Sequence, residues 1–179
     1  MYRFEEELKL IVDKDIQNFT RKCLGLAPAY FWEMPASMTG RHHPKDELVK
    51  GGQVLHVRKM VKVAEDLCLM YAVTPYERDC VLSAAIMHDL CKCGYPDQMP
   101  HTLSGHGPLW IKVGEQVATQ KQFMETPYLH LIAKLISCHM GRFDIPFLNS
   151  DDQLINIIQI SDYLVSRKYV KISLSENGD

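Results

Sequence analysis

Apolar residues in this chain recur at three- and four-residue intervals, which is the spacing of one face of a helix. On four such stripes a histidine or an aspartate stands in line with the apolar side chains. Side chains at this spacing point the same way, so these polar groups are expected to face the interior together with the core. The stripes are His56 with Met60, Val63 and Leu67; Val81, Ala84 and Ala85 with His88; Ile132, Leu135 and Ile136 with His139; and Ile155 and Ile158 with Asp162. The chain is therefore constrained to pack helices around an interior that contains polar ligands.

The whole sequence predicts an all-α fold. Strand-type alternation is scarce, and no Asn-Gly hairpin turn lies between apolar runs. Thr74, Pro75 and Glu77 form a capping box that starts one helix, and Ser150 with Gln153 is expected to start the last in the same way. The expected helices cover residues 4–24, with Phe4, Leu8, Ile11 or Val12, Phe19 and Cys23 on one side, then 51–71, 75–90, 107–122, a segment from 127 to Gly141, and 151–167.

The length of 179 residues indicates a single domain, with residues 1–50 as an N-terminal helix and loop extension and 51–167 as the core. The formal net charge of −2 argues against a protein that holds nucleic acid by overall positive potential. The sequence contains no apolar run long enough to span a bilayer and no apolar leader at its start, so we expect a cytoplasmic protein without a membrane partner. Cys91 and Cys93 have no second cysteine pair at a zinc-site spacing.

A single inward histidine is usually a core histidine with one hydrogen bond, but an inward aspartate is harder to explain. An ionised carboxylate in an apolar setting costs several kcal/mol unless it is paired or bound to metal. Asp162 has no Arg or Lys on its face within one turn before it. A shared ion would offset the burial of His56, His88, Asp89 and Asp162 at once. Imidazole and carboxylate without thiolate favour Mn, Fe, Co, Ni or Zn.

The order of these residues resembles a known family. His56, then His88-Asp89 within Ala84-Ala-Ile-Met-His-Asp-Leu90, then Asp162 within Ile157-Ile-Gln-Ile-Ser-Asp-Tyr163 is similar to the H…HD…D signature of the HD-domain metal-dependent phosphohydrolase superfamily. The resemblance covers residues 51 to 167 and implies an HD-domain-like helical bundle. It also implies one or two divalent transition-metal ions as cofactor.

Two further histidines resemble those of binuclear members of the superfamily. His106 lies in Ser104-Gly-His-Gly107, and His139 lies in Cys138-His-Met-Gly-Arg142. By resemblance these two residues hold a second ion, with Asp89 as the bridge. Some binuclear relatives carry paired histidines where this chain has Cys138-His139, and a loop role for His106 is the alternative.

The resemblance and the residue types also suggest groups that act on substrate. Lys92 is similar to the lysine of an HD-x-x-K pattern that contacts a substrate phosphate, so Asp89 and Lys92 are the expected catalytic residues. Arg142 is placed to clamp a phosphate, with a surface role as the alternative. The segment Ser37-Met-Thr-Gly-Arg-His-His43 supplies Arg41 and His43, which we expect to bind substrate if this loop folds over the site and is not only a connector.

The resulting expectation is a phosphodiesterase or nucleotidase that hydrolyses a nucleotide-type phosphoester with metal-activated water. The expected partner is a small-molecule phosphoester or a short oligonucleotide. Three alternatives remain: a single-strand-specific nuclease, a non-catalytic nucleotide-binding HD module, and a di-iron HD oxygenase. The sequence has no G-x-S-x-G elbow, Walker loop or dinucleotide-binding glycine motif.

Overall fold

The computed structural model describes residues 4–119, 122, 125–141 and 151–174, and every regular element within them is helical. The all-α prediction is therefore confirmed. The elements are α1 (Glu5–Lys9), α2 (Lys14–Gly25), α3 (Ala29–Glu33), the 3₁₀ turn η1 (Lys45–Glu47), α4 (Gly52–Met70), α5 (Pro75–Met87), the 3₁₀ turn η2 (Gly107–Trp110), α6 (Ile111–Val117), α8 (Pro127–Cys138) and α9 (Gln153–Val165).

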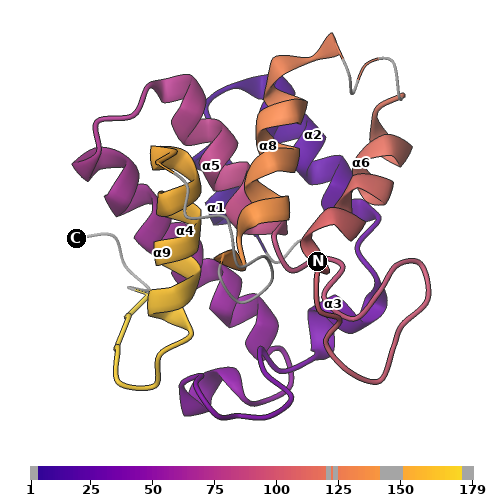
Figure 1. The fold of residues 1–179 in the computed structure, drawn as a ribbon, viewed down its shortest axis with the longest axis vertical. Helices are drawn as coiled ribbons and strands as arrows, with labels where there is room; N and C mark the ends of the chain where they lie inside the picture. The colour runs from indigo at the N-terminus through magenta and orange to yellow at the C-terminus, as the bar shows by residue number, and fades with distance from the viewer. Residues whose placement is uncertain (1–3, 120–121, 123–124, 142–150, 175–179) are drawn as a thin grey trace.

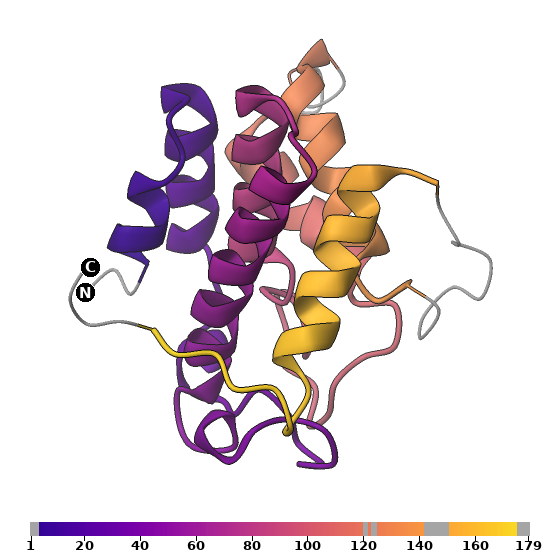
Figure 2. The same ribbon diagram turned by 90° about the vertical axis from the view of Figure 1, so that its left-hand side faces the viewer.

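Helix α4 lies on one side of the bundle and packs against both α5 and α9 (Figures 1 and 2). Helix α5 also packs on α2 and α8, so it is covered on several sides and its residues from Cys80 to Met87 are all buried. The start of α4 and the ends of α5, α8 and α9 meet at one end of the bundle, beside the loops drawn at the bottom of Figure 1. Polar residues near these helix ends are thereby gathered in one place.

The N-terminal prediction of one helix over residues 4–24 is wrong, because the chain breaks between α1 and α2. Val12, expected on the apolar side, is 71% exposed. The Asp13 side chain accepts hydrogen bonds from the amides of Asp15 and Ile16, which caps a new helix. The amides of Val12 and Asp13 donate to Oδ2 of the buried Asp79 on α5, at 2.9 and 2.7 Å. A long-range carboxylate thus replaces the helical acceptors that these two amides lose.

Of the two capping boxes predicted from the sequence, one is present and the other is not. The capping box of Thr74 and Glu77 is present at the start of α5. Helix α9, however, begins at Gln153, and its cap is Asp152, which accepts from the amides of Leu154 and Ile155. Gln153 is the first helical residue, so the predicted capping box with Ser150 is wrong at this end, and Ser150 itself lies outside the described residues.

The loop before α4 packs closely against the start of that helix. A Cβ on Gly52 would lie 2.0 Å from the backbone oxygen of Glu47, so only glycine allows this approach. The backbone of Glu47 also accepts a hydrogen bond from the amide of Ala36. The irregular segment is therefore fixed to the bundle, and the buried side chain of Glu47 is held beside the first turns of α4.

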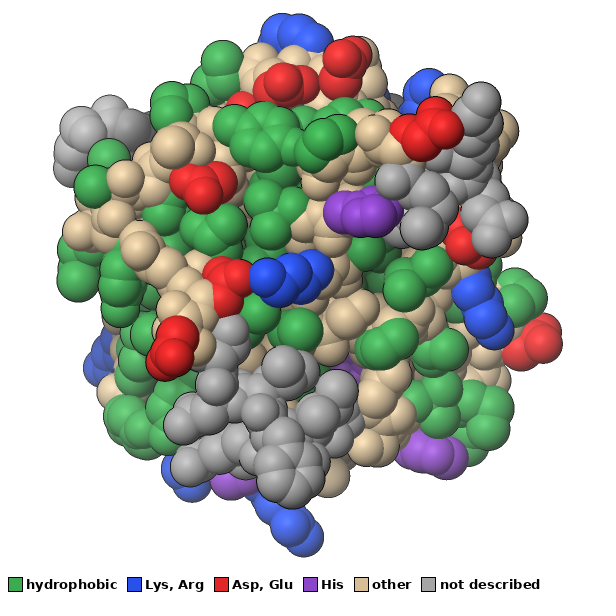
Figure 3. All heavy atoms as spheres, turned by 45° about the horizontal axis from the view of Figure 1, so that its top comes forward, with side chains coloured by type: hydrophobic (Ala, Val, Ile, Leu, Met, Phe, Trp, Pro, Cys, Tyr) green, Lys and Arg blue, Asp and Glu red, His purple; other side chains and the backbone are tan. Residues whose placement is uncertain are grey.

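The described part of one face of the molecule gives no sign of a general nucleic-acid platform. On the face shown in Figure 3, hydrophobic side chains are interspersed with acidic and basic ones outside the grey atoms. That face lacks the continuous basic surface that a phosphate backbone requires. Within the described ranges, no helix combines the length and the apolar character needed to cross a bilayer.

We predict that Asp79→Ala lowers the free energy of unfolding by about 1 to 3 kcal/mol, because the amides of Val12 and Asp13 lose their acceptor. Asp79→Asn keeps a carbonyl oxygen at the same place and should lose less. Urea unfolding of both variants measures the difference. Equal stability of Asp79→Ala and the parent chain would contradict the proposed cause of the break between α1 and α2.

Candidate metal centre

The first group of metal-type ligands joins α4, the end of α5, and α9. His56, His88 and Asp162 place their ligand atoms within 4.8 Å of one another. Nε2 of His56 lies 3.1 Å from Oδ1 of Asp162. Nε2 of His88 is buried without a hydrogen-bond partner among the described residues, and the Asp162 side chain is 17% exposed. The group therefore contains a buried ring nitrogen, Nε2 of His88, that has no hydrogen-bond partner among the described residues. One side of the group opens toward solvent at Asp162.

The second group surrounds the carboxylate of Asp89 and shares His88 with the first. Oδ1 of Asp89 lies 2.8 Å from Nε2 of His106 and 3.6 Å from Nε2 of His139. Oδ2 lies 3.4 Å from Nε2 of His88 and accepts a hydrogen bond from Lys92. The two oxygens of Asp89 thus face different histidines. The structure brings together all six residues that the sequence proposed as ligands.

Backbone carbonyls fix the protons of three of these rings. Nδ1 of His88, His106 and His139 lies 2.9, 2.8 and 2.7 Å from the carbonyl oxygens of Ala85, Leu103 and Ile136, respectively. A carbonyl oxygen only accepts, so each Nδ1 must carry the proton. In the neutral ring Nε2 is then an unprotonated acceptor. All three rings therefore present a lone pair to the same interior space.

These lone pairs oppose one another. Nε2 of His106 lies 3.2 Å from Nε2 of His139, and the carboxylate oxygen of Asp89 lies beside both. Acceptors this close repel unless a cation lies between them, and that cation is either an additional proton on one ring or a metal ion. Four imidazoles and two carboxylates are the ligands that divalent transition metals prefer. The donor set therefore fits a metal ion on its own chemistry.

The helix ends add to this preference for a cation. His88 and His139 are the C-cap residues of α5 and α8. Unpaired carbonyl groups give a helix C-terminus partial negative charge, and two such ends face the site. Gly107 allows the loop that holds His106 to approach closely, since a Cβ there would lie 2.5 Å from the carbonyl oxygen of Ile136.

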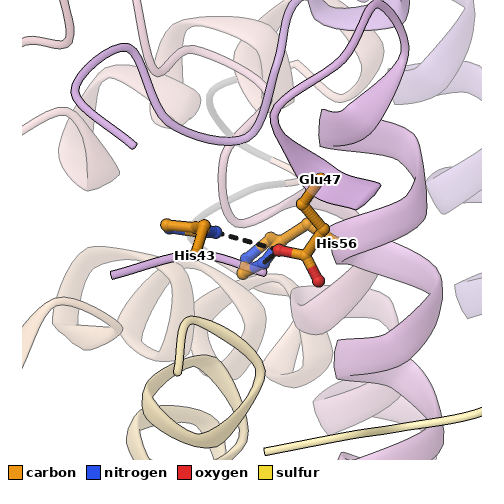
Figure 4. A group of neighbouring side chains, drawn as sticks. All are labelled: His43, Glu47 and His56. Carbon is orange, nitrogen blue, oxygen red and sulfur yellow. Dashed lines mark hydrogen bonds and ion pairs between the residues drawn. The ribbon is translucent and has the colours of Figure 1, made fainter. Parts of the chain in front are cut away.

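Glu47, which the sequence analysis missed, connects the site to the loop before α4 (Figure 4). Its carboxylate is fully buried and accepts hydrogen bonds from Nδ1 of His43 at 2.9 Å, Nδ1 of His56 at 3.2 Å and Nζ of Lys59 at 3.0 Å. Burial disfavours its charge, but these donors outweigh burial and lower the pKa of Glu47 to about 2. His43, Glu47 and His56 have the geometry of a third ligand group, yet Lys59 already supplies the countercharge.

The same carboxylate sets the state of His56. Burial opposes protonation, but the hydrogen bonds and charges of Asp162 and Glu47 outweigh it and raise the pKa of His56 to about 9. Without metal, His56 is therefore an imidazolium between two carboxylates. Partial desolvation disfavours the charge of Asp162, but the neighbouring His56 outweighs it and lowers the pKa of this carboxyl group below its usual value. A metal ion at this place replaces a proton.

The site forms the floor of a cleft of about 980 Å³. This volume accommodates a nucleotide-sized ligand. Lys92 lines the cleft and donates to Asp89 at 2.7 Å and to the Ala36 carbonyl at 2.9 Å. Two loop histidines, two turns of α9 and the end of α8 form the walls. The lining residues are Ser37, His42, His43, Asp89, Lys92, Thr102, His106, His139, Met140, Gly141, Gln159, Ile160, Asp162, Tyr163, Ser166 and Arg167.

The predicted substrate residues fall into three cases. His43 and Lys92 line the cleft, as a substrate role requires. Arg41 is exposed and is not among the lining residues. Arg142 lies outside the described residues.

Sequence reasoning missed Gln53, whose side-chain amide donates a hydrogen bond to Oδ2 of Asp89 at 3.0 Å. Gln53 lies three residues before His56 on the same face of the helix, and this spacing could have indicated that it faces the site.

Comparison with known proteins gives one match. The family model described as HD domain matches residues 54–167, which is more than half of the chain and spans all six proposed ligands. No curated protein and no solved structure gives a significant match.

We predict that Glu47→Gln weakens metal binding by about 10- to 100-fold, because an amide orients His56 less strongly and does not increase its basicity. Competition with a chromogenic chelator measures the dissociation constant. Asp46→Asn is the matched control, since Asp46 contacts the same Lys59 but is exposed and contacts no histidine. Equal losses in the two variants would show that Glu47 acts only through Lys59.

We also expect metal affinity to rise with pH up to about pH 9. The proton that His56 holds in the metal-free protein must leave before metal binds, so each pH unit below the pKa weakens binding by about tenfold. Titrations at several pH values, in two buffers of different ionisation enthalpy, measure both the affinity and the protons released. An affinity independent of pH with no proton release would contradict the assignment.

Proposed function

The chain belongs to the HD-domain superfamily of metal-dependent phosphohydrolases, and from this membership we propose that it hydrolyses a nucleotide-type phosphoester as a phosphodiesterase or nucleotidase. The observation that carries the proposal is the convergence of four histidines and two aspartates at the floor of a nucleotide-sized cleft, with Lys92 beside them. In this proposal His56, His88, Asp89, His106, His139 and Asp162 are the metal ligands.

Two ions are favoured over one because Asp89 presents its oxygens in two directions. Oδ1 faces His106 and His139, whereas Oδ2 faces His88. His56 and Asp162 form a pair on the other side of His88. Bound divalent metal would supply Lewis acidity and lower the pKa of a coordinated water.

Lys92 is the residue proposed to hold the phosphate. Its side chain lines the cleft and is 11% exposed, and its ammonium group is anchored by Asp89 and by the carbonyl of Ala36. It is thereby fixed beside the ligands without being withdrawn from the cleft. A fixed cation there stabilises the negative charge that builds on the phosphoryl oxygens in the transition state. Gln53 holds the same oxygen of Asp89 and positions it.

His43 is proposed to contact substrate from the loop side. Glu47 fixes its Nδ1, so Nε2 is the atom left for a ligand in the cleft. The loop itself is tied to the end of α9, since the amide of Lys168 donates to the carbonyl of His42 at 2.6 Å. Substrate roles for Arg41 and Arg142 stay predictions.

We expect the protein loaded with Mn²⁺ to cleave bis(p-nitrophenyl) phosphate or a nucleoside monophosphate, and Lys92→Met to lose about 10²- to 10³-fold in kcat. Lys92→Arg keeps the charge and should retain more activity. Metal content is measured on each variant, which separates loss of phosphate contact from loss of metal. If the metal-loaded parent leaves phosphodiesters, nucleotides and short single strands all uncleaved, a binding module or an oxygenase becomes the better assignment.

A further inference from the structure

The wall of the cleft that α9 forms carries more than a metal ligand. Asp162 lies at the floor, while Tyr163, Ser166 and Arg167 lie within the next turn and a half and line the same cleft. A substrate whose phosphoester is near Asp162 must therefore place part of its remaining structure against these side chains. None of them has a role in the site described above.

The guanidinium group of Arg167 lies over the ring of Tyr163. Its guanidinium carbon lies 4.1 Å from the centroid of the tyrosine ring, and its Nε donates to the carbonyl of Tyr163 at 3.3 Å. No described carboxylate lies within ion-pair distance of Arg167, so stacking and this one hydrogen bond set its orientation. The other cation that lines the cleft, Lys92, is paired with Asp89. Arg167 thus keeps a planar face for a ligand.

The surroundings of this stack favour a flat, weakly polar group over a second phosphate. Tyr163 is 40% exposed, and the neighbouring Ile160 is 36% exposed on the same helix. Met140 also lines the cleft. Guanidinium planes and tyrosine rings bind nucleobases by stacking, and such contacts tolerate every base because each has a π face.

The wall is also fixed in place. The hydrogen bond from the amide of Lys168 to the carbonyl of His42 joins the residue after Arg167 to the loop that carries His42 and His43, which also line the cleft. The stack is therefore held at a set position relative to the metal ligands. A preorganised surface loses less conformational freedom when a ligand binds.

We propose that Arg167 and Tyr163 form the subsite for the nucleobase of the substrate. The inference rests on the proposed function and deepens it, because it selects nucleotides over phosphoesters that lack a planar base. Lys92 and the metal ligands act on the phosphate, and the end of α9 recognises the base. The subsite accepts purines and pyrimidines alike, because stacking uses the π face that every base has.

Equilibrium binding tests this subsite without turnover. Isothermal titration of the Mn²⁺-loaded protein with the non-hydrolysable 5′-methylenephosphonate analogues of adenosine 5′-monophosphate and of ribose 5-phosphate compares two ligands that differ only in the base. The parent should bind the nucleotide about 5- to 100-fold more tightly, which is the contribution of one stacked base. Arg167→Ala and Tyr163→Ala should each reduce this ratio toward one. Equal affinity of the parent for both ligands would overturn the subsite.

Conservative variants separate stacking from charge. Arg167→Lys keeps the charge but loses the plane, so it should lower the ratio nearly as much as Arg167→Ala. Tyr163→Phe keeps the ring and should preserve the ratio, and Lys168→Ala is a control at an exposed neighbouring cation. If Arg167→Lys retains full discrimination, or if Arg167→Ala weakens both ligands equally, Arg167 binds an anion and the proposal is wrong.

Activity then distinguishes failure of the subsite from failure of the proposed function. If the parent cleaves phosphoesters with the same KM for the nucleotide and for ribose 5-phosphate, the proposed function is supported and the base subsite is wrong. If the parent cleaves neither ligand but binds the nucleotide more tightly through Arg167, the subsite is supported and the proposed hydrolysis is wrong. The protein is then a nucleotide-binding module.

Discussion

The repulsion among acceptor atoms inside the bundle is the constraint on which the rest of the structure depends. The ring nitrogens of His106 and His139 and a carboxylate oxygen of Asp89 face one another within hydrogen-bond distance or slightly beyond. The backbone carbonyls behind the rings fix the protons on the far side. A cation between these atoms, either an additional proton or a metal ion, makes this arrangement favourable, and the ligand types fit a divalent metal ion.

Each structural feature near the site follows from that need. Helix ends bring partial negative charge, and Gly107 permits the close approach that places His106 beside His139. At His56 the carboxylate of Glu47 takes the place that a backbone carbonyl has at the other three ligand rings. The ammonium group of Lys59 donates to this carboxylate and stabilises its charge. The irregular loop before α4 is therefore as much a part of the centre as the helices that carry the ligands.

The helical periodicity of the sequence sufficed to predict the bundle and the inward direction of four ligands that lie on apolar stripes, His56, His88, His139 and Asp162. Asp89 and His106 do not lie on these stripes, and the resemblance to the HD family was needed to assign them. What the periodicity missed depends on contacts between distant segments. The break before α2 is stabilised by Asp79, 66 residues from Asp13. Glu47 stands in a loop without periodicity, and nothing in its local pattern indicates burial. The role proposed for Arg167 could not be predicted from the sequence, because there Arg167 is only a cation after the end of a helix. The structure shows that it lines the cleft.

Elemental analysis combined with X-ray absorption spectroscopy tests whether the histidines and aspartates inside the bundle hold metal ions. The protein would be purified without chelator or incubated with Mn²⁺ or Ni²⁺, alongside Asp89→Ala. We expect about two ions per chain with nitrogen and oxygen ligands and no sulfur, and far less metal in the variant. A parent protein that binds no metal under any of these conditions, or one whose metal is bound by cysteine sulfur, would contradict this expectation.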